Sequence, residues 1–100
     1  MHIAFHPRAV EDVTTIDGWW KVNRPAAPDL FRRELEDLVM LVATSPTLGT
    51  PADTGDHDFF GVRRALMRRT RYHLYYRVTG DTLEVLAVWH AVRGELPTLA

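Results

Sequence analysis

The spacing of apolar residues changes partway along this chain, and the change constrains the fold more than any other feature of the sequence. Between residues 7 and 44, apolar side chains recur every three or four positions, as they do along one face of a helix. Between residues 71 and 90, apolar and polar side chains alternate, as they do along a strand with one buried face. Helices followed by strands are therefore predicted, which is the pattern of an α+β fold.

The first helix is predicted to begin at Pro7 and to end near Val22, after a short strand at His2–His6. Proline suits the first position of a helix, because the N–H group that it lacks has no partner there. Glu11 and Asp12 suit the positive N-terminal end of the helix dipole. The apolar stripe of this helix consists of Ala9, Val13, Ile16 and Trp20.

A second helix is predicted from Pro25 to about Thr44, after a break at Asn23-Arg24. Because the break is short, the two helices should pack as an antiparallel hairpin. Ser45-Pro46 ends the second helix, and residues 46–58 are predicted to form a loop. The apolar stripe of this helix consists of Ala27, Phe31, Leu35, Leu38 and Val42.

Three more strands are predicted at Phe59–Arg68, 71–78 and 83–90, joined by Arg69-Thr70 and by the hairpin pair Gly80-Asp81. Alternation groups Tyr72, Leu74, Tyr76 and Val78 against Arg71, His73, Tyr75 and Arg77. In the last strand it groups Leu83, Val85, Ala87 and Trp89 against Glu84, Leu86, Val88 and His90. The predicted order is β-α-α-β-β-β, with the helical hairpin on one face of a small, mostly antiparallel sheet. The first strand should pair with an edge of that sheet, and the arginine-bearing face should stay at least partly open.

The composition is that of a soluble globular protein, with 46% hydrophobic and 25% charged residues. A chain of 100 residues is long enough for one domain, residues 1–100, with one modest core. The absence of cysteine excludes disulfides and thiolate metal sites. Neither a signal peptide nor a membrane span is predicted, so we expect a cytoplasmic protein. No cofactor is predicted.

Charge is sorted along the chain. Residues 1–58 carry five Lys/Arg and ten Asp/Glu, whereas residues 59–100 carry seven and three. Between Phe59 and Gly80 there is no acidic residue, and such a segment should attract a polyanion or an acidic protein. Six arginines lie in that segment: Arg63, Arg64, Arg68, Arg69, Arg71 and Arg77.

Several short motifs, taken in order, carry a resemblance that extends over essentially the whole chain. They are Ala9-x-x-Asp12-x-x-x-Ile16, Ala26/Ala27 with Phe31, Ser45-Pro46-x-x-Gly49, Val62-Arg63, Tyr76-Arg77-Val78 and His90-x-x-Arg93. In this order and spacing the sequence resembles the RelE/ParE toxin superfamily of type II toxin–antitoxin systems. The resemblance implies a curved sheet backed by two helices, a cognate antitoxin as partner, and growth arrest when the toxin is free.

The superfamily divides by target, and the resemblance favours the ParE-like members, which inhibit DNA gyrase. RelE-like members cleave mRNA in the ribosome, and they tend to have Tyr-Arg-Leu where this chain has Tyr72-His73-Leu74. Their C-terminal tyrosine is absent here, since no tyrosine follows Tyr76. A ribosome-dependent, metal-independent endoribonuclease remains the alternative function, and a non-toxic family member is a third.

Candidate site residues differ between these functions. In a nuclease, His73 or His90 would exchange protons. The candidates for binding phosphate are Arg63, Arg71, Arg77 and Arg93. Otherwise the histidines are structural, and the six arginines form a surface for the antitoxin or the target. Trp20 lies on the apolar stripe, so its neighbour Trp19 is the candidate for a partly exposed aromatic anchor of a partner.

The loop around His57 contains residue types that can bind a metal ion. His57 lies in an acidic loop, but the spacing of its neighbours matches no established pattern of ligands. No metal site is predicted there. The acidic neighbours are Asp53, Asp56 and Asp58.

Overall fold

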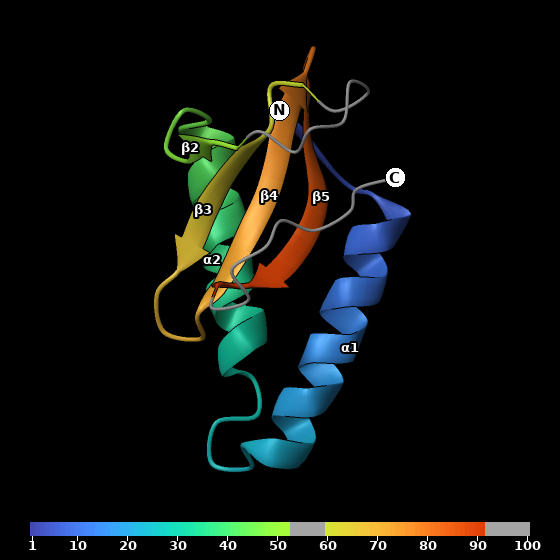
Figure 1. The fold of residues 1–100 in the computed structure, drawn as a ribbon, viewed down its shortest axis with the longest axis vertical. Coiled ribbons are helices and arrows are strands. Elements are labelled where there is room, and N and C mark those ends of the chain that lie inside the picture. The colour runs from blue at the N-terminus through green and yellow to red at the C-terminus, as the bar shows by residue number, and fades with distance from the viewer. Residues whose placement is uncertain (53–59, 92–100) are drawn as a thin grey trace.

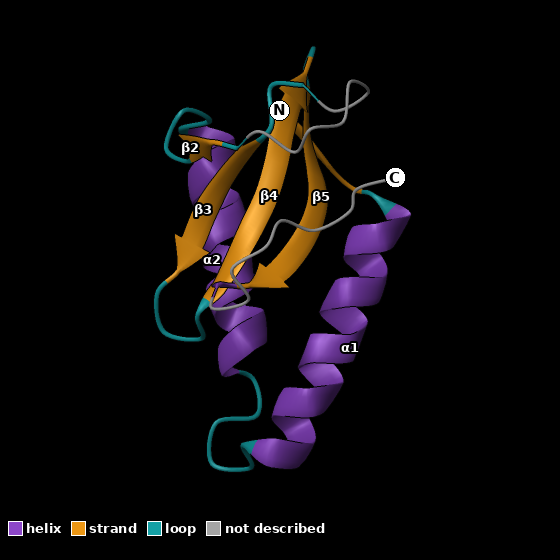
Figure 2. Ribbon diagram, viewed as in Figure 1, coloured by secondary structure: helices purple, strands orange, loops and turns teal. Residues whose placement is uncertain are grey.

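Two helices pack against a single five-stranded sheet in the computed structural model, which describes residues 1–52 and 60–91 (Figures 1 and 2). The elements are β1 (His2–Phe5), α1 (Pro7–Asn23), α2 (Leu30–Thr44), β2 (Thr50–Pro51), β3 (Arg63–Met67), β4 (Tyr72–Thr79) and β5 (Thr82–His90). The sheet order is β1-β5-β4-β3-β2, with β1 parallel to β5 and the other pairs antiparallel. The predicted α+β class and element order are confirmed.

Both helices cover the same face of the sheet, as the helical stripes predicted. Ala9 and Trp20 of α1 pack with Phe31 and Leu35 of α2 in the main core. The sheet contributes a row of apolar side chains to the same core: Ala65, Met67, Leu74, Tyr76, Leu83, Val85 and Val88. None of the described helices is long and apolar enough to cross a membrane.

The start of α1 differs from the prediction in two respects. His6 is not part of the first strand, because its Nδ1 accepts a hydrogen bond from the backbone N–H of Arg8 at 3.1 Å and so caps the helix. Pro7 begins the helix as predicted. The dipole interpretation of Glu11 and Asp12 was wrong, because the first turn contains no acidic residue. The side chain of Asp12 instead contacts the sheet, as described below.

The second helix begins at Leu30, five residues later than predicted. Two prolines precede it, Pro25 and Pro28, and a residue before proline is disfavoured in helical geometry. Ala27 consequently lies outside the helix. Val39, which was not part of the predicted apolar stripe, is buried, whereas the predicted Leu38 is only partly buried. The rest of that stripe is confirmed.

The predicted loop at 46–58 contains the two-residue strand β2, which pairs with the start of β3. The strand predicted from Phe59 begins at Arg63 in the structure. Phe59, His57 and the three loop aspartates lie outside the described residues. The connection between β3 and β4 spans Arg68–Arg71 and is longer than the predicted pair Arg69-Thr70.

A β-bulge in β5 changes which side chains of the last strand share a face of the sheet, so the predicted grouping was wrong. Tyr75 lies opposite Ala87 and Tyr76 lies opposite Val85, so Leu86 is an extra residue in β5. One extra residue exchanges the two faces for everything that follows. Val88 therefore joins the main core, and His90 lies opposite Tyr72 on the helix-covered face.

The face away from the helices is only partly open. Tyr75 and Ala87 are buried there with Val62 and Leu86 in a second, smaller apolar cluster. Trp89 packs against this cluster, opposite His73 in the sheet register. Apolar side chains therefore occupy part of the face that was predicted to be polar.

The connection between α2 and β3 is fastened to the sheet by one tyrosine. The hydroxyl of Tyr76 donates to the carbonyl oxygen of Pro46 at 2.7 Å and accepts from the N–H of Gly49 at 2.8 Å. Arg63 adds a hydrogen bond from Nη1 to the carbonyl oxygen of Gly49 at 2.7 Å. The motif Ser45-Pro46-x-x-Gly49 therefore attaches the chain to the sheet, and its Gly49 is buried at the point of contact.

Candidate functional site

The six arginines between Phe59 and Gly80 divide into two groups. The guanidinium of Arg63 donates a hydrogen bond to the carbonyl oxygen of Gly49, as described above. Arg77 donates from Nε to Oε2 of Glu84 on the neighbouring strand at 3.2 Å. Both of these predicted binding residues therefore form contacts within the chain. The other four arginines make up the cationic surface.

The other four lie on β3 and in the turn that follows it, and we call them the arginine cluster: Arg64, Arg68, Arg69 and Arg71. Arg64 lies on β3 and is half-buried, while the other three are in the turn after β3 and are exposed. Among the described residues, none of the four forms an ion pair with a carboxylate within 4 Å. Their combined charge is available to an acidic partner.

Arg71 is a turn residue and not a strand residue, contrary to the prediction. Its φ is 69°, in the left-handed region that glycine favours. Its N–H donates to the carbonyl oxygen of Met67 at 2.8 Å, and its own carbonyl oxygen accepts from the N–H of Ala91 at 2.9 Å. The turn that carries the cluster is thereby tied to the end of β5.

A carboxylate from α2 fixes the same turn from the other side. Glu34 accepts hydrogen bonds from the N–H of Arg69 at 2.8 Å, the N–H of Thr70 at 2.9 Å and the hydroxyl of Thr70 at 2.6 Å. Burial raises the pKa of Glu34. These hydrogen bonds and the charge of Arg69 together lower it by more, so the pKa lies below its ordinary value of 4.5. The ionised carboxylate thus holds the arginine-bearing turn in place.

This arrangement predicts that the protein loses part of its free energy of unfolding at acid pH. Because the pKa of Glu34 is lower in the folded chain, its stabilisation is present above pH 4.5 and is lost as the pH falls through the folded pKa. Glu34→Gln should lower the free energy of unfolding by about 1 kcal/mol at pH 7 and flatten its decline in acid. Urea unfolding between pH 7 and pH 3 measures both effects. Glu36→Gln removes an exposed carboxylate from the same helix and is the control; an unchanged acid slope in Glu34→Gln would contradict the assignment.

His73 lies beside the arginine cluster on the face away from the helices. Burial and the positive charges of Arg64 and Arg71 lower its pKa below the ordinary value of 6.5. The imidazole is therefore neutral at pH 7, and the positive charge of this surface comes from the arginines alone.

His90 faces the opposite side of the sheet. Its ring packs edge-on against Tyr72, with ring centroids 5.1 Å apart, and Tyr72 packs in the same way on Phe31 at 5.2 Å. Since Tyr72 pairs with His90 and His73 pairs with Trp89, adjacent register positions direct the two histidines to opposite faces. Either histidine was a candidate for proton exchange in a nuclease, and the structure does not bring the two together. Arg93 lies outside the described residues.

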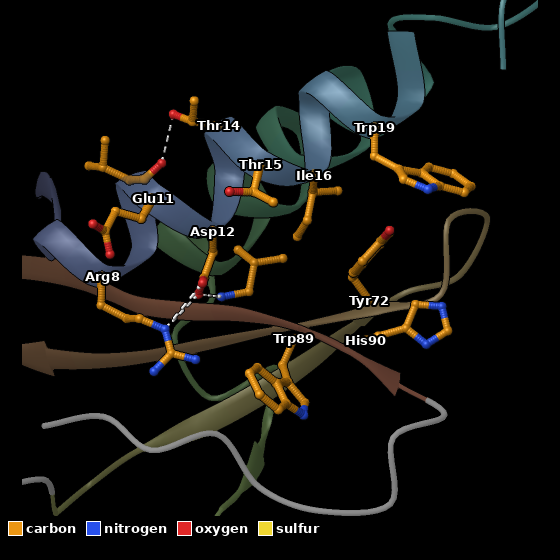
Figure 3. Close-up of a pocket in the computed structure, with 12 residues that line it drawn as sticks. Arg8, Glu11, Asp12, Thr14, Thr15, Ile16, Trp19, Tyr72, Trp89 and His90 are labelled. Carbon is orange, nitrogen blue, oxygen red and sulfur yellow. Dashed lines mark hydrogen bonds and ion pairs between the residues drawn. The ribbon is translucent and has the colours of Figure 1, made fainter. Parts of the chain in front are cut away.

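A groove runs between α1 and the C-terminal half of β5, which β1 does not reach (Figure 3). Asp12 accepts a hydrogen bond from the N–H of Val88 at 3.0 Å and forms an ion pair with Nε of Arg8 at 3.1 Å. The guanidinium of Arg8 lies over the ring of Trp89, 5.4 Å from its centroid. Asp12 thus takes the place of a strand partner for the edge of β5.

Sequence reasoning missed the roles of Asp12 and Glu34. A signal for Asp12 was present, since it lies three residues after Ala9 and next to Val13, on the side of the helix that faces the core. Glu34 carries the same signal, since it lies three residues after Phe31 and next to the buried Leu35. Both carboxylates attach a helix to the backbone of the sheet or of its turn.

Trp19 and Trp20 behave as predicted. Trp20 is 9% exposed and belongs to the core, whereas Trp19 is 45% exposed and lines the groove with Tyr72 and His90. The guanidinium of Arg24 lies 5.1 Å from the ring centroid of Trp19. An exposed indole beside a groove has the chemistry of an interface anchor.

Comparison with known proteins agrees with this architecture. The family model described as "ParE toxin of type II toxin-antitoxin system, parDE" matches residues 3–94. No curated protein matches the sequence. The solved structure of the chromosomal ParDE toxin–antitoxin system from P. aeruginosa is similar, with a TM-score of 0.63 and 20% identity over 90% of this chain and 95% of that one. The heterotetrameric YoeB-YefM toxin–antitoxin complex from Staphylococcus aureus gives a TM-score of 0.58 and 14% identity, with the same coverage. At these identities the two structures show a shared fold.

Proposed function

Since this chain belongs to the ParE toxin family of type II toxin–antitoxin systems, we propose that it binds a cognate antitoxin and, when free, arrests growth by inhibiting DNA gyrase. The antitoxin would be an acidic, partly apolar segment that docks on the arginine cluster. The gyrase-inhibiting surface would act by contact and not by bond cleavage.

The observation that carries this proposal is the placement of the two histidines. Cleavage of RNA by its own 2′-hydroxyl needs a base and an acid close to one phosphate. His73 and His90 lie on opposite faces of the sheet, and the ring of His90 is packed on Tyr72. A single phosphate cannot reach both imidazoles, and this arrangement favours a binding protein over a nuclease.

The charge of the surface supports the antitoxin assignment. The arginine cluster is held by hydrogen bonds from the turn to Glu34 and to the end of β5, so the guanidinium groups project from a fixed backbone. A preformed cationic surface attracts an acidic segment and loses less entropy when that segment binds.

The target is tested by inducing the chain without an antitoxin and measuring two activities in parallel. We expect loss of supercoiling by gyrase with intact transcripts at ribosomes. We also expect His73→Ala and His90→Ala to keep that inhibition, because neither imidazole takes part in bond cleavage. Cleaved mRNA that disappears in either histidine variant would overturn the proposal in favour of the ribosome-dependent endoribonuclease.

A further inference from the structure

The edge of the sheet opposite the arginine cluster is formed by β1, and its outer side has no strand partner among the described residues. The N–H of His2 donates to the carbonyl oxygen of Asp81 at 2.9 Å, and the N–H of His6 donates to that of Val85 at 2.8 Å. Backbone groups alternate in direction along a strand, so Ile3 and Phe5 direct their N–H and carbonyl groups outward. These outward groups can pair with another strand.

Apolar side chains adjoin this edge, and we call them the β1 patch: Ile3, Phe5, Val10 and Met40. They are 39%, 38%, 50% and 62% exposed, and they lie around one groove between β1 and the two helices. Exposed large apolar side chains that gather in one place on a small protein mark an interaction surface.

The charge around the patch indicates which partner fits it. Its rim carries Arg32 and Glu36, one residue of each sign, one turn apart on α2. Arg32 is half-exposed, and its Nη2 also lies 3.6 Å from Oδ2 of Asp17 on α1. An acidic segment is drawn to the arginine cluster and not to this neutral rim. A surface with both signs is complementary to itself when a two-fold axis brings the same surface of a second copy against it.

We propose that the β1 patch is the interface through which two copies of this chain associate, with the two β1 strands paired antiparallel about Ala4. In this register Ile3 of each copy lies opposite Phe5 of the other, and all outward backbone groups of these residues are used in four hydrogen bonds. The small side chain of Ala4 lies at the two-fold axis, where paired strands approach most closely. The two sheets join into one, and the arginine clusters remain exposed at its far sides.

The test is the oligomeric state of the purified full chain, measured by sedimentation over a range of concentrations. We expect a species of twice the 11.5 kDa chain mass that dissociates on dilution. Ile3→Pro removes an outward N–H group without removing a hydrogen bond to β5, and Met40→Lys places a charge in the patch. Each should weaken association tenfold or more, which corresponds to about 1.4 kcal/mol.

Leu41→Lys is the matched control. Leu41 follows Met40 on the same helix and is 51% exposed, but it lines a different groove, beside β3. Its dimer should be as stable as that of the unsubstituted chain. Met40→Lys changes only an exposed helical side chain, so far-UV circular dichroism should confirm that it folds.

Two outcomes would overturn the proposal: a monomer at every concentration, or a dimer that neither Ile3→Pro nor Met40→Lys weakens. A monomeric toxin whose binding to the antitoxin is weakened by Ile3→Pro would assign the edge to the antitoxin instead. None of these results depends on whether gyrase is the target.

Discussion

Replacing Gly49 with alanine is expected to lower the free energy of unfolding by about 2–5 kcal/mol, which combines overpacking with the loss of buried hydrogen bonds. A Cβ atom at this position would lie 2.6 Å from the hydroxyl of Tyr76 and 2.8 Å from the backbone oxygen of Arg64. Real Cβ atoms do not approach so closely, and the second neighbour is backbone that cannot rotate away. The Tyr76 hydroxyl must then move from the Pro46 carbonyl and the Gly49 N–H that it joins.

Gly18→Ala is the matched control, since it makes the same change at a position with open space. Gly18 lies inside α1, and a Cβ atom there meets nothing within 4 Å. Alanine should raise the free energy of unfolding by about 0.5–1 kcal/mol, because glycine loses more conformational freedom in a helix. Urea unfolding at neutral pH measures both variants. Equal effects of the two substitutions would show that the attachment at Gly49 is not close-packed.

Reversing two charges of the arginine cluster should have the largest effect on binding. Arg68→Glu with Arg71→Glu is expected to weaken the complex with the cognate antitoxin by about 100-fold or more, because unlike charges across the proposed interface become like charges. Both side chains are exposed and form no ion pair within the described residues, so the fold should be unaffected. Calorimetric titration measures the affinity.

Salt dependence and a control variant make this result specific. Added salt should weaken the native complex, since exposed charges are screened over about 8–10 Å at physiological ionic strength. Lys21→Glu reverses an exposed charge on α1, outside the arginine cluster, and its complex should keep the native affinity. If the double variant bound as tightly as the native chain at low salt, the arginine cluster would not be the docking surface.

Local sequence patterns determined the larger part of the fold. Pro7 begins the first helix, and Gly80, with a φ of 60°, turns the hairpin between the last two strands. The helical stripes and the alternation through Tyr72 and Leu74 identified most of the main core. These features depend on residues a few positions apart, so the chain specifies them before any tertiary contact forms. The ordered motifs also sufficed to identify the toxin family.

The position of the bulge in β5 could not be derived from the alternation. Residues 85–88 are all apolar, so both registers bury hydrophobic side chains equally well and the period of two is lost. Pairing with Tyr75 and Tyr76 of β4 decides which register forms. That choice sends His90 to the face opposite His73, and it separates the two histidines that were candidates for proton exchange.

The attachments that position the site are long-range contacts. Asp12 bonds to a backbone N–H group 76 residues away, Glu34 to one 36 residues away, and Gly49 to a hydroxyl 27 residues away. The sequence by itself determined the order and type of the elements, because local periodicity and turn chemistry are encoded in neighbouring residues. It also marked Asp12, Gly49 and Tyr76 as motif residues without indicating their partners. Only the tertiary structure decided which of them meet, since a hydrogen bond between distant residues depends on how the layers pack.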